Sequence, residues 1–493
     1  MAETSEVLFP KTSDKPRLSG YDYYEKLFMG DHFTAFNIAI DNNKDFNKAY
    51  AKIRYVKANF AGLISKVIAD MLFSEPIKLK VESEEQQNWL DSFVQENKLN
   101  QILYESALSN SYLGDILFKL RIGKRMAGDE DSSIILSNLP PSIYFPKINL
   151  SNIDEDPEVK ELCWIIDFID KDNKPKKYLR KEIHLPKKIV NELWRMEGDK
   201  VVEKVPFSEI GDTTTKPFED TKINRQLVVH IPNWKTVSRF WGISDFYDLD
   251  TLFFAINNRI SKIDNILDKH SDPLLVVPTG ILDEKGKVKK GSLGVVEVQD
   301  ANDGKPEYVV WDASLENAFN EIDKMVELLM MTSEISPDIL GMGKGQSDSG
   351  RALKYKMLRT IAKTARKRLY YDNAIKEIIY RSMMLAKAWG LKAGGVAFSG
   401  EPVIPEIVWA DGIPADETEL IENENARIDG GTETIEDAIM KIDGVDRDTA
   451  VEKAKKIKDE KAIEMPTNGF DMKNNPFNQV KDLKKKAEKQ GGK

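Results

Sequence analysis

The chain has 493 residues, of which 31% are charged, and its formal net charge at pH 7 is -9. This length allows roughly two to four domains with a sizeable core, and the acidic balance argues against a protein that wraps DNA around a basic face. A single cysteine and four scattered histidines argue against a disulfide framework, a thiolate metal cluster and a histidine-based metal site or triad.

These numbers leave other classes open, including a channel through which DNA passes with weak contacts. The first residues are acidic and lack an apolar run, so they do not resemble a signal peptide. No stretch approaches the roughly 18 apolar residues of a membrane-spanning helix. A reducing cytoplasm fits the cysteine content, and we expect no membrane association.

Up to about residue 240 we expect helices followed by a β-rich segment. Residues 1–40 are expected to be partly ordered, with a short helix at 21–29. Further helices are predicted at 56–73 and 84–96, and a third is capped by Asn100 and broken by Gly114. Strands are predicted at 77–81, 116–122, 133–136, 142–145, 163–168, 178–185, 189–195 and 227–231. Most spacers between the later strands are too short for crossover helices, which favours antiparallel hairpins and an α+β fold class.

An acidic cluster, Asp129, Glu130 and Asp131, follows Gly128. It allows two interpretations, a metal loop or a solvated loop. No glutamate occupies the bidentate position that an EF-hand needs, which favours the solvated loop.

Two amphipathic helices enclose a small β module. Ser244 and Asp245 offer an N-cap for the first helix, whose apolar residues Leu249, Leu252, Phe253, Ile256, Ile260, Ile263 and Leu267 share one face. The second helix is predicted from about Asp312 to Ser336-Pro337. Between them, strands are predicted at 274–278, 294–298 and 308–311. Turn signals at 283–286 and 302–304 predict hairpins.

A Gly-rich loop follows the second helix and could be mistaken for a phosphate cradle. It fails both nucleotide-binding patterns, because Gln346 replaces the third glycine and Gly345 follows Lys344. Both motifs also require a preceding strand. We expect this mobile loop to touch something outside the chain through Gly341, Met342, Gly343, Lys344, Gly345 and Gln346.

The next helix, predicted from 351 to 389 without interruption, is basic in its first half. Two interpretations stay open: a helix packed in an assembly beside acidic neighbours, which we favour, or a row facing DNA phosphates. The DNA-facing or inter-subunit candidates are Arg351, Lys354, Arg359, Lys363 and Arg366.

The C-terminal part changes in composition. Strand-like pieces are predicted at 394–398 and 403–409. Residues 415–462 read as three short helices separated by glycines, with Thr434 and Asp437 approximating a capping box. The lysine-rich end from 463 to 493 is predicted to be a disordered basic tail.

Several of these stretches, in this order, resemble portal proteins of tailed bacteriophages, in particular of long-tailed (siphovirus-like) phages or prophages. The resemblance covers roughly residues 20–460. It lies in the helix 59–70 with Phe73-Ser74-Glu75-Pro76, in Gly114–Lys119, in Trp241-Gly242-Ile243-Ser244-Asp245, in Ser349–Lys354 and in Ala362–Arg368.

The resemblance implies a division of the chain into named regions. These are a flexible N-terminus (1–20), an α+β wing (21–243), a stem of two helices (244–270 and 312–336) around a clip (271–311), a tunnel loop (337–350), a long wing helix (351–390), a wing β segment (391–412), a helical crown (413–462) and the tail (463–493).

The resemblance also implies a function. Portal proteins form rings, usually of twelve copies, at one capsid vertex, where terminase packages double-stranded DNA that is later ejected. They contact capsid, scaffolding and head-completion (connector) proteins, in the virion and in the host cytoplasm during assembly. No enzymatic activity, cofactor or metal is expected. The alternatives are a structural scaffold without a DNA channel and, less favoured, a nucleic-acid enzyme.

Overall fold

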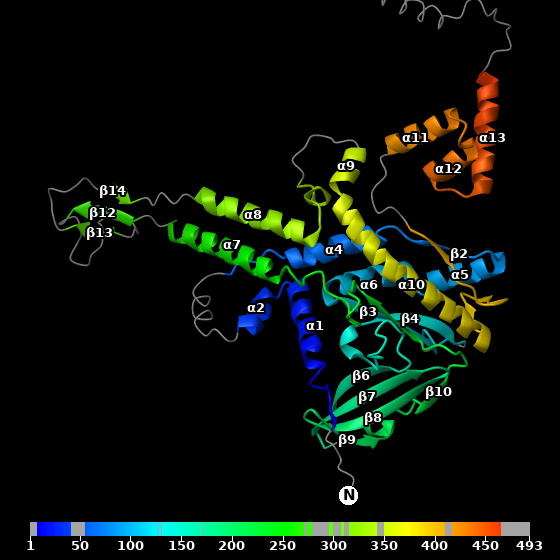
Figure 1. Ribbon diagram of the computed structural model, residues 1–493, viewed down its shortest axis with the longest axis horizontal. Helices are drawn as coiled ribbons and strands as arrows, with labels where there is room; N and C mark the ends of the chain where they lie inside the picture. Colours follow the sequence, from blue (N-terminus) through cyan, green and yellow to red (C-terminus); the bar gives the residue numbers. More distant parts are fainter. Residues whose placement is uncertain are drawn as a thin grey trace, which may run out of the picture. The chain divides into compact units, whose positions relative to one another are not determined.

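The computed structural model describes residues 7–40, 55–126, 128–129, 131–170, 172–270, 274–278, 295–298, 307–309, 315–342, 350–409 and 417–464. The chain divides into two compact units between Ile413 and Pro414. The first unit mixes helices and sheets, in agreement with the predicted α+β class, and the second is helical (Figure 1).

The N-terminal helices of the first unit are α1 (Lys15–Phe28), α2 (His32–Ile40), α4 (Phe60–Phe73), α5 (Glu84–Glu96) and α6 (Leu99–Leu113). Asn59 caps α4, because its side-chain oxygen accepts a hydrogen bond from the backbone N–H of Gly62. The prediction of Asn100 as a cap is wrong. Lys98 takes a left-handed conformation (φ 50°), so the chain turns sharply from α5 and α6 begins at Leu99. Gly114 ends α6 with φ 86°, as expected for glycine.

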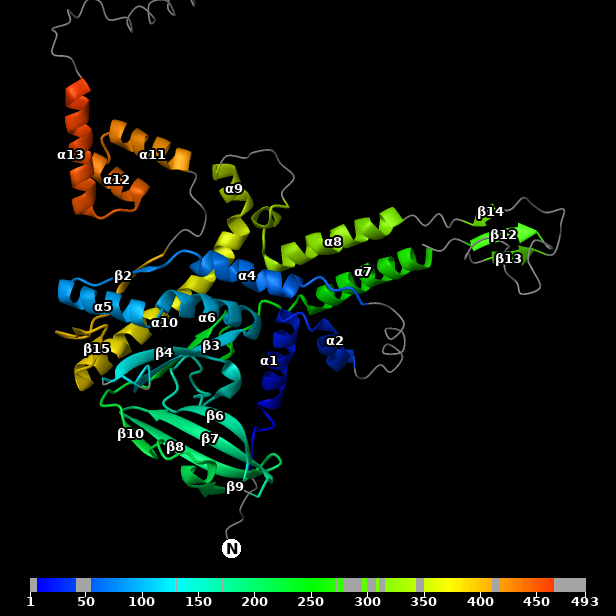
Figure 2. The same ribbon diagram turned by 180° about the vertical axis from the view of Figure 1, so that it is seen from behind.

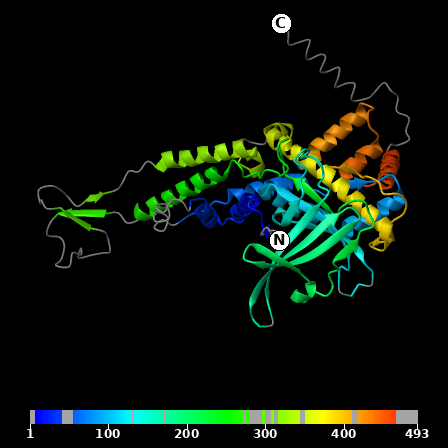
Figure 3. The ribbon, with the colours of Figure 1, turned by 60° about the horizontal axis from the view of Figure 1, so that its bottom comes forward.

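Two antiparallel sheets follow, which confirms the prediction of hairpins in this part of the chain. The larger sheet has the order β1-β9-β8-β7-β6-β5, with β10 paired to β8. Figure 3 brings its cyan-to-green strands forward. Its strands are β1 (Val7–Leu8), β5 (Tyr144–Pro146), β6 (Lys160–Ile169), β7 (Pro175–Leu185), β8 (Lys188–Glu197), β9 (Lys200–Val205) and β10 (Phe218–Asp220). Strands β1, β9 and β10 were not predicted from the sequence.

The second sheet, β11-β3-β4, packs against helices. It consists of β3 (Asp115–Gly123), β4 (Ser133–Leu139) and β11 (Val228–Pro232). The unit also has two small strand pairs, β2 (Lys78–Lys80) with β17 (Glu406–Val408), and β15 (Lys392–Ala393) with β16 (Val396–Ala397). Single 3-10 turns occur at η1 (Pro141–Ile143), η2 (Phe207–Ile210) and η3 (Pro337–Leu340).

Helix α10 (Leu358–Trp389) packs with the sheet β11-β3-β4 and with helices α4, α5 and α6. Its second half buries Ile375, Ile378 and Ile379 in one core with Phe118 and residues of α4, α5 and α6. A second core lies among α1, α4, α7 and α8. The molecule is therefore built so that α10 spans from one core to the other.

The predicted uninterrupted helix from 351 to 389 is wrong. The structure has α9 (Gly350–Lys356) and α10, with Met357 between them at φ -89° and ψ 0°. The chain still follows the helical hydrogen-bond pattern, since Met357 N–H donates to Leu353 and Ile361 N–H donates to Met357, both at 3.0 Å. The result is a bend (Figure 1), and it turns the Met357 side chain into the second core.

Helices α7 (Asp250–His270) and α8 (Leu315–Ser333) lie side by side (Figure 2) and bury their apolar stripes against each other. Between them in the sequence, β12 (Leu274–Pro278) lies in the middle of a small sheet with β13 (Val295–Val298) and β14 (Glu307–Val309). The predicted hairpins, β12 with β13 and β13 with β14, are wrong. Strand β12 pairs with β13 in parallel and with β14 in antiparallel orientation, and β13 does not pair with β14. Parallel neighbours need a crossover rather than a tight turn. Both turn signals lie outside the described residues.

The second unit consists of α11 (Glu417–Asp429), α12 (Ile435–Asp443) and α13 (Arg447–Glu464), which confirms the three predicted helices. The Thr434 hydroxyl accepts a hydrogen bond from the backbone N–H of Asp437, so the predicted cap forms. Gly431 and Gly444 take positive φ where the chain turns between helices. Of the predicted disordered tail (463–493), Ile463 and Glu464 lie in α13, and the residues from 465 onward lie outside the described residues.

Candidate functional site

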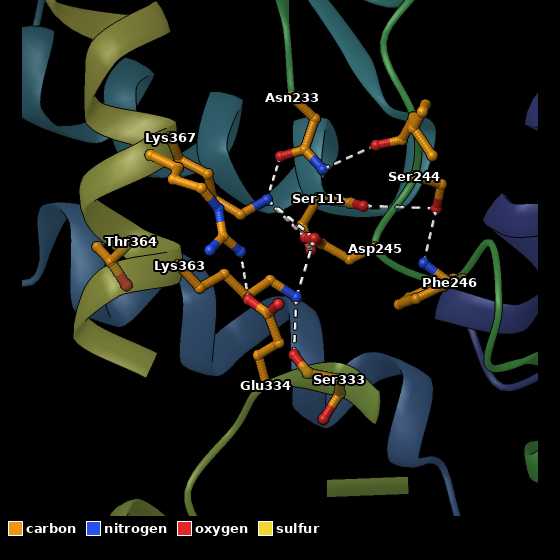
Figure 4. A network of polar contacts seen from close by, with 12 residues as sticks. Ser111, Asn233, Ser244, Asp245, Phe246, Ser333, Glu334, Lys363, Thr364 and Lys367 are labelled. Carbon is orange, nitrogen blue, oxygen red and sulfur yellow. Dashed lines mark hydrogen bonds and ion pairs between the residues drawn. The ribbon is translucent and has the colours of Figure 1, made fainter. Parts of the chain in front are cut away.

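A buried charged junction lies where the segment before α7, the end of α8 and the first half of α10 meet. We define the junction as Ser111, Asn233, Asp245, Glu334, Lys363 and Lys367; Figure 4 shows these side chains converging. Ser111 comes from α6, Asn233 from the loop after β11, and the two lysines from successive turns of α10. Their spacing of four residues places both ammonium groups on one helix face.

Asp245 is the centre of the junction. Its carboxylate accepts hydrogen bonds from Lys367 at 2.8 Å and from the Ser111 hydroxyl at 2.7 Å, and it lies 3.1 Å from the Lys363 ammonium. Burial alone would raise the pKa of the Asp245 carboxyl, but the two ammonium groups hold it below its usual value. Burial lowers the pKa of Lys367 to about 8, against the attraction of Asp245.

The prediction that Ser244 and Asp245 cap the following helix is wrong. Helix α7 begins only at Asp250, and the Ser244 hydroxyl instead accepts a hydrogen bond from the backbone N–H of Phe246 at 3.0 Å. The carboxylate of Asp245 points toward α10, where two ammonium groups compensate its charge. A charged partner is a stronger attraction for a buried carboxylate than a helix end.

Glu334 links the end of α8 to α10 through ion pairs. Its carboxylate pairs with Arg359 at 2.7 Å and also with Arg366. The Thr360 hydroxyl donates to the Glu334 carbonyl at 2.9 Å, and Lys363 donates to the Ser333 carbonyl at 2.9 Å. The last turn of α8 is thus bound to three successive turns of α10, directly before the predicted tunnel loop.

Of the predicted basic candidates, the structure turns Lys363 inward. This corrects the surface role expected for it, because Asp245 and Ser333 satisfy its ammonium inside the chain. Arg359 and Arg366 remain on the surface, with 69% and 49% of their side chains exposed. Lys354 is also exposed, and the side chain of Arg351 lies outside the described residues. A DNA-facing or inter-subunit role stays a prediction for these residues.

Only the start of the predicted tunnel loop is described. The turn η3 ends at Gly341, which takes φ 69°, and Met342 is 53% exposed. The other expected loop residues, Gly343, Lys344, Gly345 and Gln346, lie outside the described residues. Sequence reasoning missed Glu334, Asp245 and Lys367 as junction residues. The spacing of Lys363 and Lys367 was the available signal.

A second polar cluster holds the chain crossing beside the junction. The Asp115 carboxylate accepts hydrogen bonds from Tyr21 at 2.8 Å, from His230 at 2.7 Å and from the backbone N–H of Gly242 at 2.8 Å. A Cβ on Gly242 would lie 1.9 Å from the Gly114 carbonyl oxygen, so only glycine allows this approach. Two of the stretches that carry the family resemblance, those around Gly114 and Gly242, therefore meet here, and the neighbouring Asp245 links them to a third through Lys363 and Lys367.

The surroundings of the junction are polar and partly open. A cleft of about 300 Å³ reaches Asp245, Lys363 and Arg366, with Trp234 and Tyr247 among its walls.

Within the described ranges, no group of three or more histidine, cysteine or acidic side chains is arranged to hold a metal ion. Asp129 accepts hydrogen bonds from the backbone of Arg125 and Met126, and so closes a turn.

The arrangement is that of a structural joint: it binds a two-helix extension to an α+β body through compensated buried charges. The comparison with protein families identifies the kind of structure. The family model described as phage portal protein, SPP1 Gp6-like, matches residues 11–467, so the chain belongs to this family. A search of curated proteins finds no match to the chain.

Family membership confirms the resemblance and the function it implies. The chain is a phage portal protein, which acts at the capsid vertex in packaging of the genome. The family is structural rather than enzymatic, and its members assemble with themselves into rings within the capsid. No helix in the described part of the chain is long and apolar enough to cross a membrane.

Proposed function

We propose that about twelve copies of the chain form a ring in which α7 and α8 are the stem around a channel for double-stranded DNA. The observation that carries this proposal is the junction. It fixes a pair of long helices to the body through Asp245 and Glu334, and the small sheet β13-β12-β14 lies between these helices in the chain. In this proposal residues 271–311 are the clip, 21–243 and 391–412 the wing, and 413–462 the crown.

The charge of α8 supports a channel in which DNA slides. Glu316, Asp323 and Glu327 are exposed on this helix. Carboxylates repel phosphates, so a channel wall of this kind does not hold the DNA tightly. Counterion release, which makes basic surfaces bind DNA strongly, needs lysines and arginines instead.

The tunnel loop connects α8 to α9, and the residues directly before it are bound to α10. Glu334 precedes it, and the backbone N–H of Ser336 donates to the Thr360 hydroxyl at 2.8 Å. We propose that Met342, Lys344 and Gln346 touch the DNA transiently. Movement of the loop is then resisted by α10, to which both Glu334 and Ser336 are bound.

The proposed partners follow from the role of a portal. The terminase large subunit supplies the work of packaging, a head-completion (connector) protein docks at the clip, and capsid and scaffolding proteins surround the wing. The protein acts in the virion and assembles in the host cytoplasm. A structural scaffold without a DNA channel is the second candidate.

Native mass spectrometry and negative-stain imaging test the ring. We expect closed rings with a central hole and a mass near 670 kDa, roughly twelve times the 56.0 kDa of the chain. Open filaments or compact dimers would contradict the proposal. Rings without a hole would favour the scaffold.

Deleting residues 341–346 tests the tunnel loop. We expect rings of unchanged mass that package or retain less DNA. The control is Glu84→Gln, an exposed substitution in α5 that lies far from the loop in sequence. Normal packaging by the loop deletion would show that the loop does not act on DNA.

A further inference from the structure

The first half of α10 carries an uncovered apolar stripe. Leu358, Ala362, Ala365 and Leu369 follow one another at spacings of four, three and four, which places them on one helix face. Leu358 is 61% exposed and Leu369 67% exposed. We call these four residues the α10 seam. Its two central alanines leave room for another backbone to approach closely.

The rim of the seam is basic. Arg359 and Arg366 flank it, and both reach the single carboxylate of Glu334. Two guanidinium groups on one carboxylate leave one positive charge uncompensated. An apolar centre with a positive rim fits an apolar surface with a negative rim better than it fits DNA, whose phosphates would gain nothing from the leucines.

A cleft with these complementary properties lies between α1 and α6. It has a volume of about 320 Å³ and an apolar floor that includes Leu18 and Leu113. Its rim carries Asp22, Glu25 and Glu105. On its wall, the buried Oδ1 atom of Asn138 has no hydrogen-bond partner among the described residues. A basic side chain from outside could donate to this oxygen.

The seam and the cleft lie on opposite sides of the first unit. Figure 1 shows α10 in front of α4 and α6, whereas in Figure 2 α5 and α6 are in front of it. The inner face of α10 packs against the core that includes α4 and β3. The two surfaces therefore cannot meet within the first unit of one chain, but two copies placed side by side can bring them together.

We propose that the α10 seam of one copy docks into the α1–α6 cleft of the next copy, and that this is a repeating contact of the ring. Such a contact joins two different surfaces, so it continues from copy to copy until the ring closes. It rests on the ring proposed above. It adds the residues that make the contact: Leu358 and Leu369 on one side, and Glu25 and Glu105 on the other.

Cross-linking tests the contact directly on assembled rings, formed by the protein alone or inside procapsids. The variant Leu369→Cys/Glu105→Cys carries one cysteine on each surface and is treated with a short bismaleimide. We expect a ladder of covalent oligomers, because each copy links to two neighbours. Each single variant is expected to stay monomeric. The native Cys163 is buried and reacts little.

The matched control is Leu369→Cys/Glu84→Cys, in which the second cysteine replaces an exposed acid of α5 outside the cleft. Assembled rings that give no more ladder than this control would overturn the inference and leave the portal function intact. A cross-link within one chain would overturn it as well. Dimers from either single variant would show that like surfaces meet, which also contradicts the contact.

Charge reversal gives a second, independent measurement. We expect Glu25→Lys/Glu105→Lys to reduce incorporation into rings at least tenfold, while the unfolding temperature of the monomer stays within a few degrees. Glu84→Lys, the control, should assemble normally. Equal assembly of the two variants would contradict the proposed contact, whereas failure of every variant and of the native chain to form rings would instead contradict the ring itself.

Discussion

Asp245 shows what one buried carboxylate does in this molecule. It lies outside any helix, is 8% exposed, and brings together α6 and two turns of α10. A buried charge is tolerated only when partners compensate it. Because those partners come from segments more than a hundred residues apart, Asp245 selects one arrangement of the chain.

Replacing Asp245 by Asn should destabilise the first unit by about 3 to 5 kcal/mol, since Lys363 and Lys367 would keep buried charges without a counter-ion. Denaturant unfolding followed by circular dichroism measures this. Asp248→Asn, three residues along and exposed, is the control and should change stability little. Adding Lys367→Met to Asp245→Asn should recover part of the loss. No recovery would show that the charge balance is not the cause.

Glu182 makes stability depend on pH. Burial would raise the pKa of its carboxyl, but the hydrogen bond from His184 and the charge of Lys119 outweigh this and lower it to about 2, from 4.5. A folded-state pKa below the unfolded value contributes stability above pH 4.5, and this contribution is lost as pH falls from about 4.5 to 2.

We therefore expect Glu182→Gln to be less stable than the native chain at pH 7, by about 3 kcal/mol at most, and the difference to shrink as pH falls toward 2. Unfolding in denaturant at pH 7, 4 and 3 measures it. Glu84→Gln, an exposed control, should track the native chain throughout. A difference that is the same at pH 7 and pH 3 would contradict the assignment.

The partners of the buried charged residues could not be predicted from the sequence. Periodicity shows that Lys363 and Lys367 share a helix face, but it cannot show that a carboxylate 118 residues earlier faces them. Asp245 was interpreted as a cap because a local role is visible in the sequence and a distant partner is not. Arg359 and Arg366 lie on the surface, and a DNA-facing or inter-subunit role stays a prediction for them.

At the scale of elements, helices with clear caps, glycines and apolar periodicity could be predicted from the sequence. Helix α5 was predicted with its observed bounds, and the three helices of the second unit follow their glycines and the Thr434 cap. No glycine or proline marks the bend at Met357, whose side chain packs into the second core, so the sequence carries no local signal for it. Strand β9, rich in lysine and valine, was missed because one face is solvated and its pattern is short.

The crossing of Gly114 and Gly242 gives a prediction about how elements fit together. Gly242→Ala places a methyl group on the Gly114 carbonyl and near the backbone N–H of Asn233, neither of which can rotate away. We expect destabilisation of about 4 kcal/mol or more, or failure to fold, measured by thermal unfolding. Gly20→Ala, in α1 with open space around it, is the control and should be neutral or stabilising. A mild effect of Gly242→Ala would show that the crossing relaxes easily.

For the whole molecule, the stretches that resemble portal proteins gain a physical explanation. The segments around Gly114, Gly242 and Lys363 are distant in sequence but form one joint between the body and the paired helices α7 and α8. None of them has the residues of a catalytic motif. In the ring proposed above, their role is to hold a precise angle between parts, because identical copies must close on one another.

The division after Ile413 predicts that the second unit is dispensable for the fold of the first. The second unit has its own small core, with Ala438, Ile439 and Ala450 buried. Caps and ion pairs within the second unit, such as Lys441 with Glu424 at 3.3 Å, stabilise its helices. The second unit should therefore unfold separately. A chain ending at Ile413 should therefore keep the unfolding midpoint of the first unit and lose a separate, smaller transition. Calorimetry of this chain, beside a control ending at Glu464, measures both. Loss of the main transition would mean that the two units fold as one, and that the joint at Asp245 depends on contacts beyond the first unit.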